Sequence, residues 1–245
     1  MTAKGEQWLH GVKVFVTCEH ASAAIPRELG DLGLSKGVLA SHRAFDLGAL
    51  GVARLLAKGL RAPLYVGKWS RLVVDLNRSQ DHKQVVVRRL DGKPVPGNQL
   101  NRGEVTWRLA KYWSPFRTEA QTDIVNAAAH APVLHLSVHS FVPKLKGVDR
   151  RNDIGLLHDP DRPFEIIFCA LLKAMLARSD LRVRRNFPYF GNTDGFASHL
   201  RSVLPVMSYL GLEIECNQRA VADKAGEKRV AGALKQALRD VFAFE

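Results

Sequence analysis

The stretch VKVFVTCEH, residues 12–20, begins as a run rich in β-branched residues and ends at Cys18, Glu19 and His20. A short apolar run of this kind is typical of a strand buried inside a parallel sheet. Such a strand would hold Glu19 and His20 at its carboxyl end. Because ligands of open α/β sheets bind outside the carboxyl ends of the strands, the stretch predicts both a fold class and the place of a functional site.

Strands and helices alternate along the rest of the chain. Apolar residues at positions 45, 49, 52, 56 and 60 recur at helical spacing, so a helix is expected to begin near Asp46 and to hold this carboxylate in its first turn. Further strands are predicted at residues 63–66, 72–76, 132–138, 154–157, 181–183 and 210–214. Further helices are predicted from residue 101 or 103 to 129, with an interruption at Pro115, and over residues 161–177 and 228–242.

This alternation predicts one α/β domain over residues 1–245. Its central sheet is expected to be mixed and mostly parallel, with helices on both faces. The length of 245 residues lies just below the size at which single cores divide into domains. Residues 79–100 contain the turn sequences DGKP and PGN and are expected to leave the sheet as a long excursion, a kind of loop that often serves as a lid.

The composition is that of a globular protein, with 46% hydrophobic and 24% charged residues. No apolar run approaches the roughly 18 residues that a membrane-spanning helix needs, so no membrane partner is expected. Residues 1–11 lack the apolar stretch of a secretory signal, which favours a cytoplasmic location. Three cysteines, Cys18, Cys169 and Cys216, lie in apolar surroundings and are expected to be buried thiols.

The charge balance is strongly basic: 36 lysines and arginines stand against 24 acidic residues, a formal net charge of +12. A charge of this size raises the question of nucleic-acid binding. The basic residues are spread in small groups such as Arg88-Arg89 and Arg150-Arg151, without an uninterrupted basic tract or an aromatic-glycine RNA signature. Solvated surface charge is therefore favoured, a field that attracts small anions comes second, and nucleic acid comes third and is not expected as a partner.

Polar side chains stand at or near the carboxyl ends of several predicted strands: His20, Asn77, Arg78, His139 and Glu213. In a mostly parallel sheet these ends meet along one edge. The sequence therefore predicts that these residues converge in one crevice.

Two imidazoles and one carboxylate of this group suggest a metal site. His20 and His139 suit a zinc-type ion as neutral imidazoles, and Asp46 would be a third ligand that leaves one coordination position open. Glu19 is the alternative third ligand. Each histidine can equally be a hydrogen-bonded structural side chain, and Asp46 a helix N-terminal carboxylate. Because the chain contains no HExxH motif, the metal hypothesis rests on the joint placement of these residues.

A metal-activated water also needs a proton acceptor. Glu213 emerges from the apolar run at residues 206–212, and partial burial is expected to raise its pKa toward the range of a general base. Glu215 shares its face of the strand and is the alternative. Arg78 and Arg150 would hold a substrate carboxylate through paired hydrogen bonds, unless they form surface salt bridges.

The residues at these positions belong to blocks of sequence with a recognisable order. The blocks are VTCEHAS at 16–22 followed by IP at 25–26, DLGA at 46–49, SRLVVDLNR at 70–78, SVHSF at 137–141, NFPY at 186–189 and GLEIE at 211–215. Together they resemble the N-formylglutamate amidohydrolase family in order and spacing, from about residue 12 to 218. The SRLVVDLNR and SVHSF blocks are the most specific.

The resemblance implies a zinc-dependent hydrolase with a phosphorylase/hydrolase-like α/β fold, which cleaves an amide such as the formyl group of N-formylglutamate. The order of histidine, carboxylate, histidine and late glutamate is also similar to that of zinc N-acetylmuramoyl-amidases and related to that of zinc carboxypeptidases. By this comparison His20, Asp46 and His139 fall on the ligand positions for one zinc ion. Glu213 falls on the position of the base, which favours it over Glu215.

The expected function is therefore hydrolysis of a linear N-formyl or N-acyl amino acid, a small anionic molecule bound by Asn77, Arg78 and Arg150. Two positions depart from the family pattern: Glu215 stands where many relatives carry a basic residue, and residues 151–153 read Arg-Asn-Asp in place of a proline-aromatic pair. Both positions lie near the expected substrate-binding end. The resemblance therefore supports the hydrolytic residues of this chain more strongly than it supports a particular substrate. A cell-wall or peptide amidase with the same metal centre and a non-enzymatic, basic nucleic-acid-binding module are the alternatives, and the oligomeric state is left open.

Overall fold

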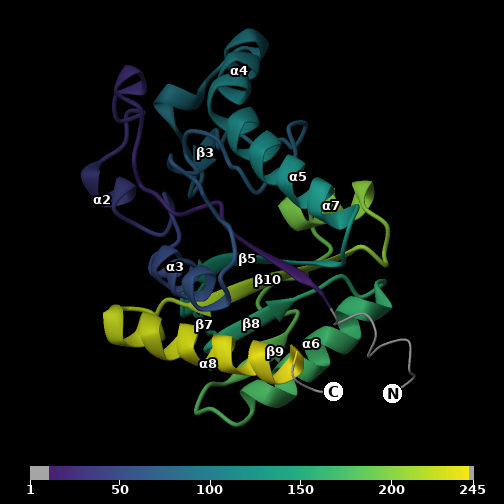
Figure 1. Ribbon diagram of the computed structural model, residues 1–245. Coiled ribbons are helices and arrows are strands. Elements are labelled where there is room, and N and C mark those ends of the chain that lie inside the picture. Colours follow the sequence, from purple (N-terminus) through teal and green to yellow (C-terminus); the bar gives the residue numbers. More distant parts are fainter. Residues whose placement is uncertain (1–10, 243–245) are drawn as a thin grey trace.

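The computed structural model describes residues 11–242 and is built on a six-stranded sheet (Figure 1). The strands lie in the order β2, β1, β5, β10, β8, β9. Their bounds are Lys13–Cys18 (β1), Leu64–Val66 (β2), Val133–Phe141 (β5), Ile154–Leu157 (β8), Val183–Arg185 (β9) and Tyr209–Asn217 (β10). Neighbouring strands run parallel except β10 and β8, which run antiparallel. The predicted mixed, mostly parallel sheet is confirmed.

Helices cover both faces of this sheet, as predicted (Figure 1). One face carries α3 (Ala49–Leu60), α6 (Pro163–Leu176) and α8 (Lys224–Phe242), and the other carries α5 (Ser114–Ala128) and α7 (Phe196–Val203). In the main core, apolar side chains of the central strands pack against α3, α6 and α8. A second cluster, which includes Phe15, Tyr209 and Ile124, joins the opposite side of the sheet to α5 and α7.

Shorter elements complete the chain. They are η1 (Arg27–Leu29), α2 (Lys36–Leu39), β3 (Arg89–Leu90), β4 (Lys93–Pro94), η2 (Pro96–Asn98), α4 (Arg102–Arg108), the π-helical turn η3 (Leu109–Trp113), β6 (Lys144–Leu145) and β7 (Val148–Asp149). Residues 79–100 leave the sheet, as predicted, and contain the β3–β4 hairpin. The expected interruption of the long helix is present as η3, directly before Pro115 in the first turn of α5, where proline's missing N–H costs nothing.

The strand predicted at residues 72–76 is wrong. This segment is a series of turns, with Val73 N–H donating to Ser70 O at 2.9 Å and Arg78 N–H donating to Asp75 O at 3.1 Å. Its apolar side chains are nonetheless buried, because they pack into two small clusters beside residues 79–100 and α4. Burial on several sides produces the same apolar run as a central strand, so the sequence pattern alone does not separate the two.

The prediction that Asp46 lies in the first turn of a helix is also wrong, because α3 begins only at Ala49. Gly48 precedes it with a φ of 79°, a left-handed conformation that a glycine adopts without strain. Asp46 lies in the turn before this glycine, and its N–H donates to His20 O at 2.9 Å. The carboxylate is therefore attached to the end of β1 rather than to the helix.

The parallel register of the central strands brings their polar ends to one edge. Thr17 of β1 pairs with Ser137 of β5, and Ser137 pairs with Glu213 of β10. His20 follows β1, while β5 continues past His139 to Phe141, three residues further than predicted. Of the residues expected to converge, His20, His139 and Glu213 do so because the three strands are in step, whereas Asn77 and Arg78 come from the turns at residues 70–78.

No helix within residues 11–242 is long and apolar enough to cross a membrane. Cys18, Cys169 and Cys216 are buried and unpaired, as predicted. The predictions that concern residues 1–10 and 243–245, including most of the N-terminal segment without a signal sequence, lie outside the described residues.

Candidate metal centre and active site

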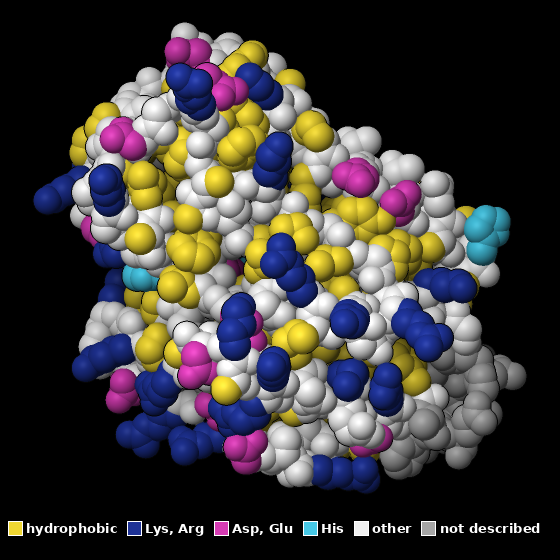
Figure 2. All heavy atoms as spheres, turned by 60° about the vertical axis from the view of Figure 1, so that its left-hand side comes forward, with side chains coloured by type: hydrophobic (Ala, Val, Ile, Leu, Met, Phe, Trp, Pro, Cys, Tyr) yellow, Lys and Arg dark blue, Asp and Glu magenta, His cyan; other side chains and the backbone are white. Residues whose placement is uncertain are grey.

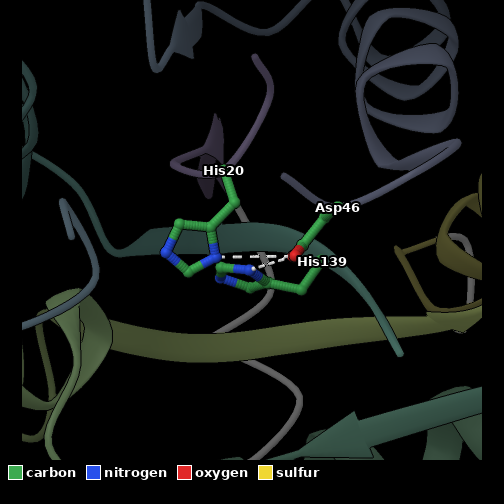
Figure 3. Close-up of side chains that lie close together, drawn as sticks. All are labelled: His20, Asp46 and His139. Atoms are coloured by element: carbon green, nitrogen blue, oxygen red, sulfur yellow. Dashed lines mark hydrogen bonds and ion pairs between the residues drawn. The ribbon is translucent and has the colours of Figure 1, made fainter. Parts of the chain in front are cut away.

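Three side chains that were predicted as ligands converge at the edge of the sheet. One ligand atom from each of His20, Asp46 and His139 lies within 4.8 Å of the other two, and all three residues are buried. Asp46 Oδ2 lies 2.9 Å from His139 Nδ1 and 3.5 Å from His20 Nδ1. Figure 3 shows both imidazole rings turned with these nitrogens toward the carboxylate.

The opposite nitrogen of each ring is held by a carboxylate or a hydroxyl. His20 Nε2 lies 2.6 Å from Asp75 Oδ1. His139 Nε2 lies 2.9 Å from Ser137 Oγ and 3.3 Å from Glu19 Oε2. An imidazole whose outer nitrogen donates to a carboxylate presents its other nitrogen as a lone pair, which is the usual arrangement behind a metal ligand.

The proton positions follow from the hydrogen bonds. Ser137 donates its hydroxyl proton to Glu19 Oε2 at 2.8 Å, so it accepts from His139, which places a proton on Nε2 and leaves Nδ1 to face Asp46. His20 Nδ1 is buried and has no hydrogen-bond partner among residues 11–242. Two ring nitrogens and a carboxylate oxygen thus face one another, and such a group of acceptors requires a cation or additional protons between them. The donor set fits a zinc-type ion.

Glu19, the alternative third ligand, lies on the Nε2 side of His139 and is fully buried. Its two oxygens accept hydrogen bonds from Thr17 Oγ1 at 2.7 Å and from Ser137 Oγ at 2.8 Å. Burial alone would raise the pKa of this carboxyl, but in the metal-free protein the hydrogen bond and positive charge of protonated His139 lower it to about 2. Glu19 is therefore placed behind a histidine rather than beside Asp46.

A cavity of about 480 Å³ opens over this group. It is lined by His20, Asp46, Arg71, Asn77, Arg78, His82, His139, Ser140, Leu157, Tyr189, Thr193, Asp194, Glu213 and Glu215. Glu213 and Glu215 are two residues apart on β10 and so share one face of the sheet. Burial raises the pKa of Glu213 above its ordinary value and raises that of Glu215 to about 8.

The predicted substrate-binding residues are placed differently from one another. Asn77 and Arg78 line the cavity; Asn77 Oδ1 accepts from Phe196 N–H at 2.7 Å, and Arg78 Nη1 donates to Asp194 O at 2.6 Å. Arg150 does not line the cavity, but it donates to Tyr189 Oη at 3.2 Å, and Tyr189 does. The structure therefore brings Arg150 to the cavity only through Tyr189.

Arg71 and Asp75 were not predicted as site residues. Arg71 Nη2 donates to Asp75 Oδ2 at 2.7 Å, and its Nη1 lies 3.7 Å from Asp46 Oδ1. Burial would raise the pKa of Asp75, but Arg71 and His20 hold it well below its usual range. The available signal in the sequence was a pair of opposite charges four residues apart within SRLVVDLNR. A strand at residues 72–76 would not bring this pair next to a histidine, so the wrong strand prediction hid its role.

Basic side chains do not form a continuous track on the face drawn in Figure 2. There, lysines and arginines are most frequent in the lower half and alternate with acidic, apolar and uncharged groups. This distribution matches the scattered basic groups of the sequence.

The fold is a mixed, mostly parallel α/β sheet that carries a histidine and carboxylate centre where its central strands end. The model of the family described as N-formylglutamate amidohydrolase matches residues 12–222. The chain belongs to the N-formylglutamate amidohydrolase family and is an amide-bond hydrolase.

Two solved structures resemble the chain over nearly its whole length. A gene product of Agrobacterium tumefaciens is 32% identical, with a TM-score of 0.83 over 96% of this chain and 92% of that one. The N-formylglutamate amidohydrolase of Ralstonia eutropha JMP134 is 17% identical, with a TM-score of 0.75 over 96% of this chain and 95% of that one, and shares the fold. No protein among the curated sequences matches the chain.

A buried chain of hydrogen bonds connects Tyr209, His135 and Thr17 to Glu19, which lies behind His139. His135 lies between Tyr209 Oη, 2.7 Å from Nδ1, and Thr17 Oγ1, 2.8 Å from Nε2. Because Thr17 gives its proton to Glu19, it accepts from His135 Nε2–H, and Nδ1 accepts from the tyrosine. Burial lowers the pKa of His135 to about 4, so the neutral ring is the form that fits this chain.

We expect His135 to make the metal-free protein sensitive to acid. The unfolded chain takes up a proton on this ring below about pH 6.5, whereas the folded chain does so only near pH 4, so the stabilisation is complete above pH 6.5 and is lost as the pH falls. Between pH 7 and 4 the free energy of unfolding should fall by roughly 3 kcal/mol more in the wild type than in His135→Gln. Urea unfolding at several pH values measures this, and exposed His130→Gln is the control. Parallel pH curves for the wild type and His135→Gln would contradict the assignment.

Proposed function

We propose that the protein is a zinc-dependent amidohydrolase that cleaves the amide of an N-formyl or N-acyl amino acid. N-formylglutamate, the namesake substrate of the family, is one member of this class. The observation that carries the proposal is that His20 Nδ1, His139 Nδ1 and Asp46 Oδ2 lie close together in the lining of a cavity that Glu213 also lines. A cytoplasmic location and a small-molecule partner with a carboxylate are part of the same proposal.

His20, Asp46 and His139 would hold one zinc ion per chain, with Asp46 rather than Glu19 as the carboxylate ligand. Zinc bound by three protein ligands polarises a carbonyl and lowers the pKa of a water molecule in the fourth position. Asp75 and Glu19 orient the two imidazoles through their Nε2 atoms. These outer carboxylates also keep both rings in the tautomer with a free Nδ1.

Glu213 is proposed as the general base. It lines the cavity, and burial raises its pKa, so its carboxylate accepts a proton more readily than an exposed glutamate does. The proton taken from water would pass to the nitrogen of the departing amine. Arg78 would hold the substrate carboxylate. Its neighbour Asn77 has its side-chain nitrogen 3.4 Å from His139 Nε2. Arg150 would act on the substrate through Tyr189.

Metal content is the direct test of the ligand set. His20→Ala and His139→Ala should each abolish zinc retention, because two protein ligands rarely hold zinc tightly. Asp46→Ala should weaken retention strongly, and Glu19→Gln should lower zinc affinity by about 10- to 100-fold as an outer partner does. Elemental analysis after dialysis measures this, with His130→Ala as the control. Full zinc content in a folded His139→Ala protein would rule the site out.

Replacement of Glu213 tests the base. Glu213→Gln keeps the size of the side chain but removes the proton acceptor, so kcat should fall by about 10²- to 10⁴-fold with zinc content unchanged. Glu119→Gln, on the exposed side of α5, is the control and should retain wild-type kcat. Activity within a few-fold of the wild type would move the role to Glu215.

Arg78→Lys tests the contact with the substrate carboxylate. Lysine keeps the charge but loses the planar pair of donors, so KM for N-formylnorleucine should rise by about 10-fold or more. The amide N-formylnorleucinamide, which lacks the carboxylate, should be affected much less. Steady-state kinetics on both compounds gives the ratio. An equal loss on both would make Arg78 a structural partner of Asp194 instead.

A further inference from the structure

The carboxyl of Glu215 has no role in the mechanism above, yet it lies in the same cavity as the metal centre. It is 6% exposed, pairs in register with His139, and follows Glu213 on the same face of β10. Its Oε2 is buried and has no hydrogen-bond partner among residues 11–242. A buried carboxyl oxygen without a donor is costly for a fold, and a ligand that supplies the donor relieves this cost.

Arg71 and His139, two charged donors that act on Glu215, are already hydrogen-bonded to other groups. Arg71 donates to Asp75 and faces Asp46. His139 is held between Asp46 and Ser137. On the neighbouring strand, Glu215 pairs with Gly155, which has no side chain to offer. A molecule bound in the cavity could therefore supply the hydrogen-bond donor that Glu215 Oε2 lacks.

The charges that line the cavity point the same way. Four carboxylates, Asp46, Asp194, Glu213 and Glu215, stand against two arginines, Arg71 and Arg78.

Each arginine is already paired: Arg71 with Asp75 and Asp46, Arg78 with Asp194 at 3.9 Å. Zinc would compensate Asp46. The arginines near Glu215 and Glu213 already pair with other carboxylates, Arg71 with Asp75, Arg78 with Asp194 and Arg201 with Glu165. Burial disfavours the ionised form of Glu215, and a positive charge beside it would stabilise that form, whereas a second negative charge on the substrate would be repelled by it.

We propose that Glu215 is a specificity residue, which selects N-acyl amino acids whose side chain carries a cationic hydrogen-bond donor such as an ammonium group. This inference rests on the proposed function and narrows its substrate class. The substrate carboxylate would lie toward Arg78, the amide toward the metal ligands and Glu213, and the side-chain cation toward Glu215. An acidic side chain, as in N-formylglutamate, would be disfavoured at this position.

Binding without turnover tests the proposal. The zinc-loaded Glu213→Gln protein is titrated by calorimetry with N-formyllysine, N-formylnorleucine and N-formylglutamate, of which the first two differ by the ammonium group. We expect N-formyllysine to bind about 10-fold or more tightly than N-formylnorleucine, and N-formylglutamate to bind most weakly, since a buried charge-assisted hydrogen bond is worth at least this factor. N-formylglutamate binding as tightly as N-formyllysine would overturn the proposal.

A second substitution assigns the preference to Glu215. Adding Glu215→Gln to the same background should remove most of the advantage of N-formyllysine with zinc content unchanged, and adding the exposed Glu119→Gln should leave it intact. Glu215→Met, which has a similar shape and no charge, replaces Glu215→Gln if that protein does not fold. An unchanged lysine advantage, or loss of zinc from the Glu215 variants, would overturn the role.

Turnover by the enzyme with Glu213 intact separates this inference from the proposed function. If none of the three compounds is hydrolysed but the binding order holds, the proposed function is wrong and the specificity of the cavity stands. If they are hydrolysed and N-formylglutamate has the highest kcat/KM, the function stands and the specificity proposal is wrong.

Discussion

The parallel register of β1, β5 and β10 is the constraint on which the site depends. A parallel strand presents its residues in step with its neighbour, so Thr17, Ser137 and Glu213 lie in one row across the sheet. A slip of one residue in β5 would turn His139 to the opposite face and would break both its contact with Asp46 and the Ser137 bond to Glu19. The apolar residues that alternate with these polar ones belong to the main core, so burial of the core enforces the same register.

The polar side of the central strands is a connected set of hydrogen bonds. It runs from Tyr209 through His135, Thr17 and Glu19 to Ser137 and His139. A buried network of this kind stabilises a fold only when its members are satisfied, and each donor here has one acceptor. The bond that Ser137 donates to Glu19 places a proton on His139 Nε2, so that Nδ1, which faces Asp46, is the nitrogen free to act as a ligand. The chemistry at the edge is thus set by residues that never reach the cavity.

Much of the fold was predictable because its signals are local. The strand at residues 154–157 and the helices α6 and α8 were identified from apolar runs, helix-start residues and spacing. The predicted ends of the strands pointed to His20, His139 and Glu213. The errors have physical causes. Residues 72–76 are buried by loops and a helix instead of by neighbouring strands, and the apolar spacing before α3 continues through a turn that Gly48 ends. Arg71 and Asp75 belong to the turns around residues 72–76, so a prediction that treated this segment as a strand did not place them in the site. The short helix α7, which was not predicted, has only two turns and follows residues rich in glycine and turn-forming types.

Asp46 lies in a turn that a single backbone hydrogen bond attaches to the end of β1, and this placement has a consequence for folding. A metal ion held as proposed by positions 20, 46 and 139 would act as a cross-link between segments that are distant in sequence. It would close the chain between His20 and Asp46, which contains η1 and α2, into a loop fastened to the sheet. The three ligands come together only in the folded chain, so the free energy of binding the ion would add to the free energy of folding. The three cysteines form no disulfide, so the bound ion would be the cross-link between distant segments of this chain.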